Sequence, residues 1–152
     1  MAFLAPGSPA PEIPLNDQDG VPVSLSEYRG KKVVVFFYAE DNSGTCTKEA
    51  CNLRDNYDVL RAKGFEVLGV SPDDEKSHRK FIAKQTLNYR LIADPEHKWI
   101  QAFGVWGEKQ MYGRSYMGLL RTTFLIDENG IVTHVIEKVK SAEHAAQILE
   151  LA

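Results

Sequence analysis

The apolar positions of the chain fall into short, unbroken runs that predict β-strands. Residues 33–38 and 65–70 are almost wholly apolar, a pattern typical of strands that are covered on both faces. A shorter strand and turn are predicted at 91–95. Residues 122–127 and 131–136 lie on either side of a turn at Glu128-Asn129-Gly130, which predicts a β-hairpin.

Between these runs the apolar residues recur at helical spacing. They mark one face of a helix from Cys46 to Leu60, and Gly64 supplies its stop. Capping-box spacing at 24–27 predicts a short helical turn that ends at Gly30. Further helices are expected to begin near 71–74, to span 96–103 and to close the chain at 142–151. An extended entry is predicted for 1–20, and a loop or irregular hairpin for 104–120.

Strands that alternate with helices, followed by a hairpin, predict an α/β fold whose sheet lies between helices. The chain has 152 residues and shows no repeat, linker or low-complexity tract. We therefore expect a single domain over residues 1–152, long enough to bury a substantial core.

The charge and hydropathy of the chain exclude several classes of partner. A net charge of -3 and the lack of a Lys/Arg cluster argue against nucleic acid. No apolar run approaches the roughly 20 residues needed to span a bilayer, so no membrane association is expected. The segment 1–7 lacks the basic region and apolar stretch of a signal peptide, which makes the cytoplasm the expected location.

The two cysteines, Cys46 and Cys51, lie five residues apart directly after the first apolar run. In a reducing compartment such a pair indicates a catalytic, metal-binding or redox-sensing role more often than a structural disulfide. A metal site is the weaker alternative, because no second Cys pair or His pair stands at ligand spacing. Two buried, inert thiols are the other alternative. The four histidines are scattered, and each is expected to be an ordinary surface or packed imidazole: His78, His97, His134 and His144.

The expected start of a helix near Cys46 distinguishes the two thiols. Free N–H groups and the positive end of the helix dipole stabilise a thiolate there, so Cys46 is predicted to be the nucleophile and Cys51 its partner. Five residues of helix separate two Cα atoms by roughly 8–9 Å. That exceeds the ~7 Å limit for a disulfide, so pairing of these cysteines requires the start of the helix to unwind.

The sequence around the cysteines resembles the active-site segment of peroxiredoxins. Residues 38–55 read YAEDNSGTCTKEACNLRD, and their cysteine spacing is similar to that of the bacterioferritin-comigratory (Q-type) subgroup. YGRSYMG at 112–118, RTTFLID at 121–127 and GSPAP at 7–11 are similar to the same subgroup, so the resemblance covers essentially the whole chain. It implies a thioredoxin-like, peroxiredoxin-type fold, with a central mixed β-sheet flanked by helices on both faces.

The resemblance also implies an activity, a thiol peroxidase that serves antioxidant defence. Cys46 would attack hydrogen peroxide or an organic hydroperoxide and become a sulfenic acid. Cys51 would resolve it as an intramolecular Cys46-Cys51 disulfide, and thioredoxin or a similar dithiol would reduce that disulfide. No metal or other cofactor is implied, and a monomer, or at most a weak dimer, is expected.

Three further residues receive expected roles from the resemblance. Ser43, at the position of the family threonine, and Arg121, at that of the active-site arginine, would bind and orient the peroxide. Glu49 fits the subgroup as a supporting residue. The alternatives are a solvated strand-end arginine for Arg121 and a first-turn helix acid favoured by the dipole for Glu49.

The chain departs from the family pattern at two positions. Ala39 stands where the family has a proline whose ring shields the sulfur, and Gly44 replaces a proline common in the subgroup. Both changes predict a more mobile entry into the helix.

Two other functions use the same cysteines. A redox sensor would react with peroxide no faster than free cysteine does. A thioredoxin-like disulfide reductase would act on protein disulfides without peroxide turnover, although the missing CxxC motif argues against it.

Overall fold

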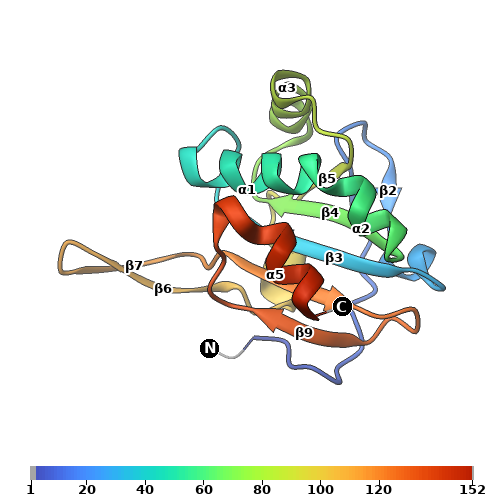
Figure 1. The fold of residues 1–152 in the computed structure, drawn as a ribbon. Helices are drawn as coiled ribbons and strands as arrows, with labels where there is room; N and C mark the ends of the chain where they lie inside the picture. The colour runs from blue at the N-terminus through green and yellow to red at the C-terminus, as the bar shows by residue number, and fades with distance from the viewer. Residues whose placement is uncertain (1–2, 152) are drawn as a thin grey trace.

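The computed structural model describes residues 3–151, which form a five-stranded sheet between two layers (Figure 1). The strand order is β5-β4-β3-β8-β9. The central strand β3 pairs in parallel with β4 and antiparallel with β8, so the sheet is mixed as predicted. The strands are β3 (Lys32–Phe37), β4 (Phe65–Ser71), β5 (Arg90–Ala93), β8 (Thr122–Ile126) and β9 (Val132–Ile136).

Each face of the sheet carries its own hydrophobic core. Along β3, Val34 and Phe36 pack on one face, while Val35 and Phe37 pack on the other, and all four are buried. Strands buried on both faces read as continuous apolar runs, which is why this strand is so clear in the sequence.

Helices cover both faces of the sheet, which confirms the α/β prediction. One face is covered by α1 (Gly44–Asp55), α2 (Tyr57–Ala62), α3 (Glu75–Gln85) and α5 (His144–Leu151), the last preceded by the 3-10 turn η2 (Ser141–Glu143). The other face is covered by α4 (Lys98–Ala102), the hairpin β1 (Leu15–Asn16)–β2 (Pro22–Val23) and the 3-10 turn η1 (Leu25–Tyr28). In the described residues no helix is both long and apolar enough to cross a membrane.

The helix that carries the cysteines is shorter than predicted. Instead of continuing to Gly64, α1 ends at Asp55, and α2 starts at Tyr57 after a break at Asn56. The Asn56 side chain donates to the Asn52 carbonyl at 2.8 Å. Asparagine competes in this way for backbone groups, so a break here has a local cause that the hydrophobic spacing does not reveal.

The segment 104–120 is a regular hairpin rather than a loop. Strands β6 (Trp106–Met111) and β7 (Arg114–Leu119) pair antiparallel without a register shift. Tyr112 and Gly113 both have positive φ, as a tight two-residue hairpin turn requires. The hairpin extends away from the central sheet (Figure 1), so its strands lack the one-sided burial that creates alternation in a sequence.

The other predicted strands and helices form at or close to the predicted positions within residues 3–151, apart from one cap. Residues 1 and 2 of the predicted extended entry and residue 152 of the expected domain lie outside the described residues. The predicted turn at 24–27 forms η1, but the Ser24 side chain makes no capping hydrogen bond. The expected helix start at 71–74 becomes the N-cap Asp74, whose carboxylate accepts from the Ser77 amide at 2.8 Å.

Candidate active site

Cys46 lies in the first turn of α1, at the point where the chain leaves the end of β3. The helix begins at Gly44, and Ser43 is its N-cap in an extended conformation. The Ser43 hydroxyl oxygen accepts from the Cys46 amide at 3.4 Å. The Cys46 side chain itself is buried in the core between α1 and the sheet. A short link from a buried strand to a helix therefore places Cys46 in the first turn of the helix, where backbone N–H groups lack intrahelical partners.

Cys51 occupies a different surface of the same helix. It is only partly buried, and its Sγ donates to the Gln85 side-chain oxygen at 3.5 Å. Both thiols are free, and α1 is unbroken between them. Ideal helix geometry keeps their Cα atoms roughly 8–9 Å apart. A Cys46-Cys51 disulfide is therefore incompatible with this conformation of the helix.

Arg121 reaches α1 through Glu49. The Arg121 Nη2 donates to Glu49 Oε1 at 3.0 Å and to Ser141 Oγ at 2.8 Å. Glu49 is fully buried and lies beyond the first turn of α1, so the reading of Glu49 as a first-turn helix acid favoured by the dipole is wrong. Only 22% of the Arg121 side chain is exposed, so the reading of Arg121 as a solvated strand-end residue is also wrong.

Burial changes the protonation of the groups behind this ion pair. Burial raises the pKa of Glu49 to about 7, even though the charge and hydrogen bond of Arg121 lower it. Burial lowers the pKa of His144 to about 4; a hydrogen bond with Gln147 raises it and the charge of Arg121 lowers it further. Both shifts follow from the cost of burying a charge, and the neutral forms of Glu49 and His144 are favoured.

The hydrogen bonds of His144 assign its neutral tautomer. Its Nδ1 lies 2.9 Å from the Gln147 side-chain oxygen, which can only accept, so Nδ1 carries the proton. Its Nε2 then accepts from the Thr123 hydroxyl at 2.7 Å. Glu49 Oε2 lies 3.4 Å from the same Nε2. A buried polar cluster thus links α1, β8 and α5 beneath the first two turns of α1.

Asn52 provides a second link between α1 and the C-terminal helix. Its side-chain nitrogen donates to the Ala142 carbonyl at 2.9 Å, and its oxygen accepts from the Ala145 amide at 2.7 Å. Sequence reasoning missed this contact and the role of His144, because both join residues about 90 positions apart and no spacing rule connects them.

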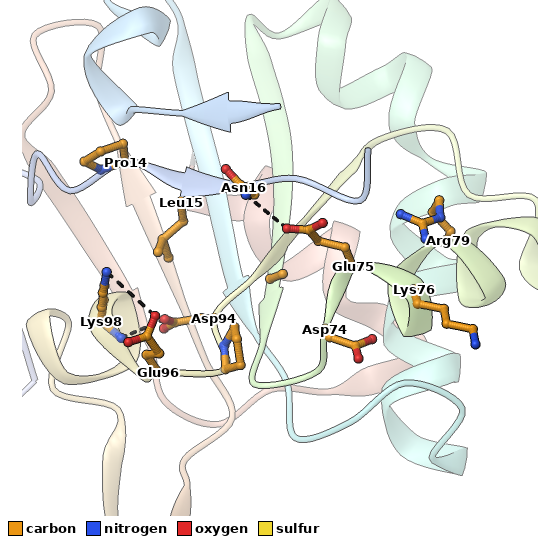
Figure 2. A pocket seen from close by; sticks show the side chains of 12 residues that line it. Pro14, Leu15, Asn16, Asp74, Glu75, Lys76, Arg79, Asp94, Glu96 and Lys98 are labelled. Atoms are coloured by element: carbon orange, nitrogen blue, oxygen red, sulfur yellow. Dashed lines mark hydrogen bonds and ion pairs between the residues drawn. The ribbon is translucent and has the colours of Figure 1, made fainter. Parts of the chain in front are cut away.

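A metal centre or a pocket next to the thiols would widen the chemistry open to this site. Within residues 3–151 no group of three His, Cys, Asp or Glu side chains is placed to hold a metal ion. A pocket of about 500 Å³ lies between β1, the start of α3 and the loop before α4 (Figure 2). Charges of both signs line it, and the Glu75 carboxylate accepts there from the Asn16 amide at 3.0 Å. Neither Cys46 nor Cys51 is among the residues that line this pocket.

Comparison with known proteins places the whole chain in one family. Residues 6–135 match the model of the AhpC/TSA family. The chain is 41% identical over 146 residues to Peroxiredoxin Bcp of Escherichia coli strain K12, covering 96% of this chain and 94% of that protein. A crystal structure of Xylella fastidiosa PrxQ superposes with a TM-score of 0.92 at 29% identity, covering 99% and 96% of the two chains. The bacterioferritin comigratory protein of Xanthomonas campestris has a TM-score of 0.86 at 34% identity, covering 91% and 88%. The resemblance found in the sequence is thereby confirmed: the chain belongs to the AhpC/TSA family, within its Bcp and peroxiredoxin Q group.

Proposed function

We propose that this protein is a thiol peroxidase in which Cys46 reduces a hydroperoxide. The observation that carries the proposal is the position of Cys46 in the first turn of α1, with Ser43 as the N-cap and the Arg121–Glu49 pair one turn further along. The Cys46 thiolate attacks the terminal oxygen of ROOH, the O–O bond breaks, and ROH leaves after taking up a proton. Cys46 is left as a sulfenic acid, oxidised by two electrons.

The first turn of α1 supports this step electrostatically. Free backbone N–H groups at a helix start favour negative charge on the sulfur and on the peroxide oxygens. The Ser43 hydroxyl uses its oxygen to cap the helix, so its proton remains able to donate to the peroxide. Arg121, held by Glu49 and Ser141, contributes a fixed cation.

Cys51 is the proposed resolving residue. Its thiol condenses with the sulfenic acid of Cys46, forming the disulfide and releasing water. Because α1 separates the two cysteines, its first turns must unwind before the sulfur atoms can meet. The contact between Cys51 and Gln85 has to break in this step.

An external dithiol of the thioredoxin class is the proposed reductant, since the disulfide must be returned to two thiols for the next turnover. The Xanthomonas campestris relative is described by its alkyl peroxide reduction activity. We infer that organic hydroperoxides as well as hydrogen peroxide are substrates here. The cytoplasm remains the expected compartment, and a monomer or weak dimer the expected form.

Stopped-flow reduction of hydrogen peroxide by the wild type, Cys46→Ser and Cys51→Ser tests the proposal. The wild type should react orders of magnitude faster than free cysteine, and Cys46→Ser should not react. Cys51→Ser should consume one equivalent and stop as sulfenic acid. Peroxide turnover retained in Cys46→Ser would refute the assignment of the nucleophile, and normal recycling of Cys51→Ser with thioredoxin would refute that of the resolving residue.

A further inference from the structure

The loop between β3 and α1 is held by a buried carboxylate. Residues 38–43 connect the end of β3 to the N-cap of α1, so their conformation sets the position of Ser43 and Cys46. Within this loop Asn42 has a φ of 68°, a left-handed conformation that costs energy outside glycine. Some feature of the surroundings must therefore keep the loop in place, and neither Ala39 nor Gly44 offers the stiffness of a proline ring.

Three side chains converge on the Asp41 carboxylate. The Tyr38 hydroxyl donates to Oδ1 at 2.6 Å, and the Ser77 hydroxyl donates to Oδ2 at 2.7 Å. The Nδ1 of His78 lies 2.8 Å from the same Oδ2. Only 2% of the Asp41 side chain and none of the His78 side chain is exposed. The loop is thus tied to the first turn of α3 by short, buried hydrogen bonds.

Asp41 is ionised, which strengthens the hydrogen bonds that hold the loop; we call this cluster of Tyr38, Asp41, Ser77 and His78 the clamp. Burial raises the pKa of Asp41, but the hydrogen bond and charge of His78, with hydrogen bonds from Tyr38 and Ser77, outweigh it and lower the pKa overall. Asp41 is therefore a carboxylate. The other nitrogen of His78, Nε2, lies 3.0 Å from the carbonyl oxygen of Ile92, so both ring nitrogens face hydrogen-bond acceptors.

The backbone of the loop is fixed at the same residue. The Asp41 amide donates to Asp73 Oδ2 at 2.7 Å, and the Ser71 hydroxyl donates to this oxygen at 2.9 Å. Ser71 is the last residue of β4, the neighbour of β3 in the sheet. The loop is therefore anchored on two sides, by α3 and by the end of β4.

We propose that Asp41 and His78 are positioning residues that hold the 38–43 loop rigid and thereby keep Ser43 and Cys46 in the geometry needed to attack a peroxide. The clamp supplies through hydrogen bonds the stiffness that a proline at position 39 would supply through its ring. This inference rests on the proposed peroxidase function. A loosened loop slows the attack on peroxide, but it does not slow disulfide formation, because that step needs the neighbouring first turn of α1 to unwind.

The test measures the two steps separately in Asp41→Asn and His78→Gln. The rate constant for peroxide should fall about 10- to 100-fold, as expected when a reacting group is displaced by about an ångström. The rate of disulfide formation after oxidation should stay the same or rise. Tyr38→Phe removes a single hydroxyl and should give a smaller loss in the same direction, which keeps the test valid if Asp41→Asn does not fold.

Asp17→Asn is the matched control for the loss of a buried, hydrogen-bonded carboxylate. Asp17 accepts from the Asp19 and Val21 amides and pairs with Arg90, in the turn between β1 and β2. Its loss should lower thermal stability without a selective effect on the peroxide step. If Asp41→Asn behaves like Asp17→Asn, or keeps the wild-type rate constant, the positioning role is refuted.

Rescue by proline separates stiffening of the loop from general stability. Ala39→Pro combined with Asp41→Asn should recover most of the lost rate, and failure to recover any of it overturns the proposal. Amide hydrogen exchange at residues 39–47 should accelerate in Asp41→Asn, and unchanged exchange there also overturns it. Because exchange does not depend on peroxide, it tests the clamp even if the wild type shows no turnover, a result that would refute only the proposed function.

Discussion

Glu49 Oε1 accepts from Arg121 Nη2 at 3.0 Å, while its second oxygen, Oε2, lies 3.4 Å from His144 Nε2. One buried carboxyl group therefore faces a permanent cation on one side and a neutral imidazole on the other. Because α1 carries Glu49 one turn after Cys46, the protonation of this group bears on the stability of the active-site helix.

The first prediction concerns the dependence of stability on pH. Glu49 has its pKa raised from 4.5 to about 7, so the stability it contributes is complete below pH 4.5 and is lost as the pH rises to about 7. His144 has its pKa lowered from 6.5 to about 4, so its contribution is complete above pH 6.5 and is lost as the pH falls to about 4. Between pH 4.5 and 6.5 the two slopes oppose each other and should nearly cancel in the wild type.

Replacing Glu49 or His144 alone should reveal what that residue contributes to the pH dependence of stability. Relative to the wild type, Glu49→Gln should gain stability by about 3 kcal/mol as the pH rises from 4.5 to 7, and His144→Gln should lose about 3 kcal/mol as the pH rises from 4 to 6.5. Urea unfolding at several pH values measures both. Taking differences from the wild type removes the contributions of other groups. Parallel profiles for all three proteins would contradict the pKa assignment.

A second prediction concerns the N-cap of α1. Ser43→Ala should reduce stability by about 0.5 kcal/mol, at the low end for a cap, because the 3.4 Å contact with the Cys46 amide is long. The rate constant for peroxide should fall much more, by about 100-fold, if the hydroxyl also donates to the peroxide. Ser43→Thr keeps the hydroxyl and should restore both quantities in calorimetry and stopped-flow kinetics. Equal activity of the alanine and threonine variants would show that the hydroxyl has no part in the reaction.

Arg121→Ala should separate stability from activity. The substitution leaves Glu49 buried without its cation, which should cost about 3 kcal/mol at pH 8, where the carboxyl is charged. The peroxide rate constant should fall about 100-fold or more. Adding Glu49→Gln removes the unpaired charge, so the double variant should recover stability but not the rate. Recovery of the rate as well would mean that Arg121 acts only through the fold.

The last prediction concerns the link between Asn52 and the C-terminal helix. Asn52→Ala breaks hydrogen bonds to Ala142 and Ala145 and should lower stability by about 1–2 kcal/mol. Since Asn52 follows Cys51 directly, its loss should ease unwinding of α1 and accelerate disulfide formation after a pulse of peroxide. Asn88→Ala is the control, because the Asn88 side chain donates to the Arg54 carbonyl at 3.2 Å, near the other end of α1. An unchanged rate of disulfide formation in Asn52→Ala would show that the Asn52 hydrogen bonds do not restrain the unwinding of α1.

Local signals in the sequence predicted most of the elements. Strand β3 is clear because both of its faces are buried, and α3 because Asp74 caps its start. The prediction from local sequence patterns was wrong in two places, at the end of α1 and at the β6–β7 hairpin. The helix breaks at Asn56 because of that side chain's own hydrogen bond, and β6–β7 lacks alternation because its strands pair only with each other.

The sequence by itself determined the α/β fold, the family and the position of Cys46 at a helix start, because each depends on residues that are neighbours in the chain. The tertiary structure alone decided which distant residues surround that helix. The contacts of Glu49 with Arg121 and His144, and of Asp41 with His78, join positions 37 to 95 residues apart. Such pairs form only when the folded sheet brings β3, α3, β8 and α5 together, and no local spacing encodes them.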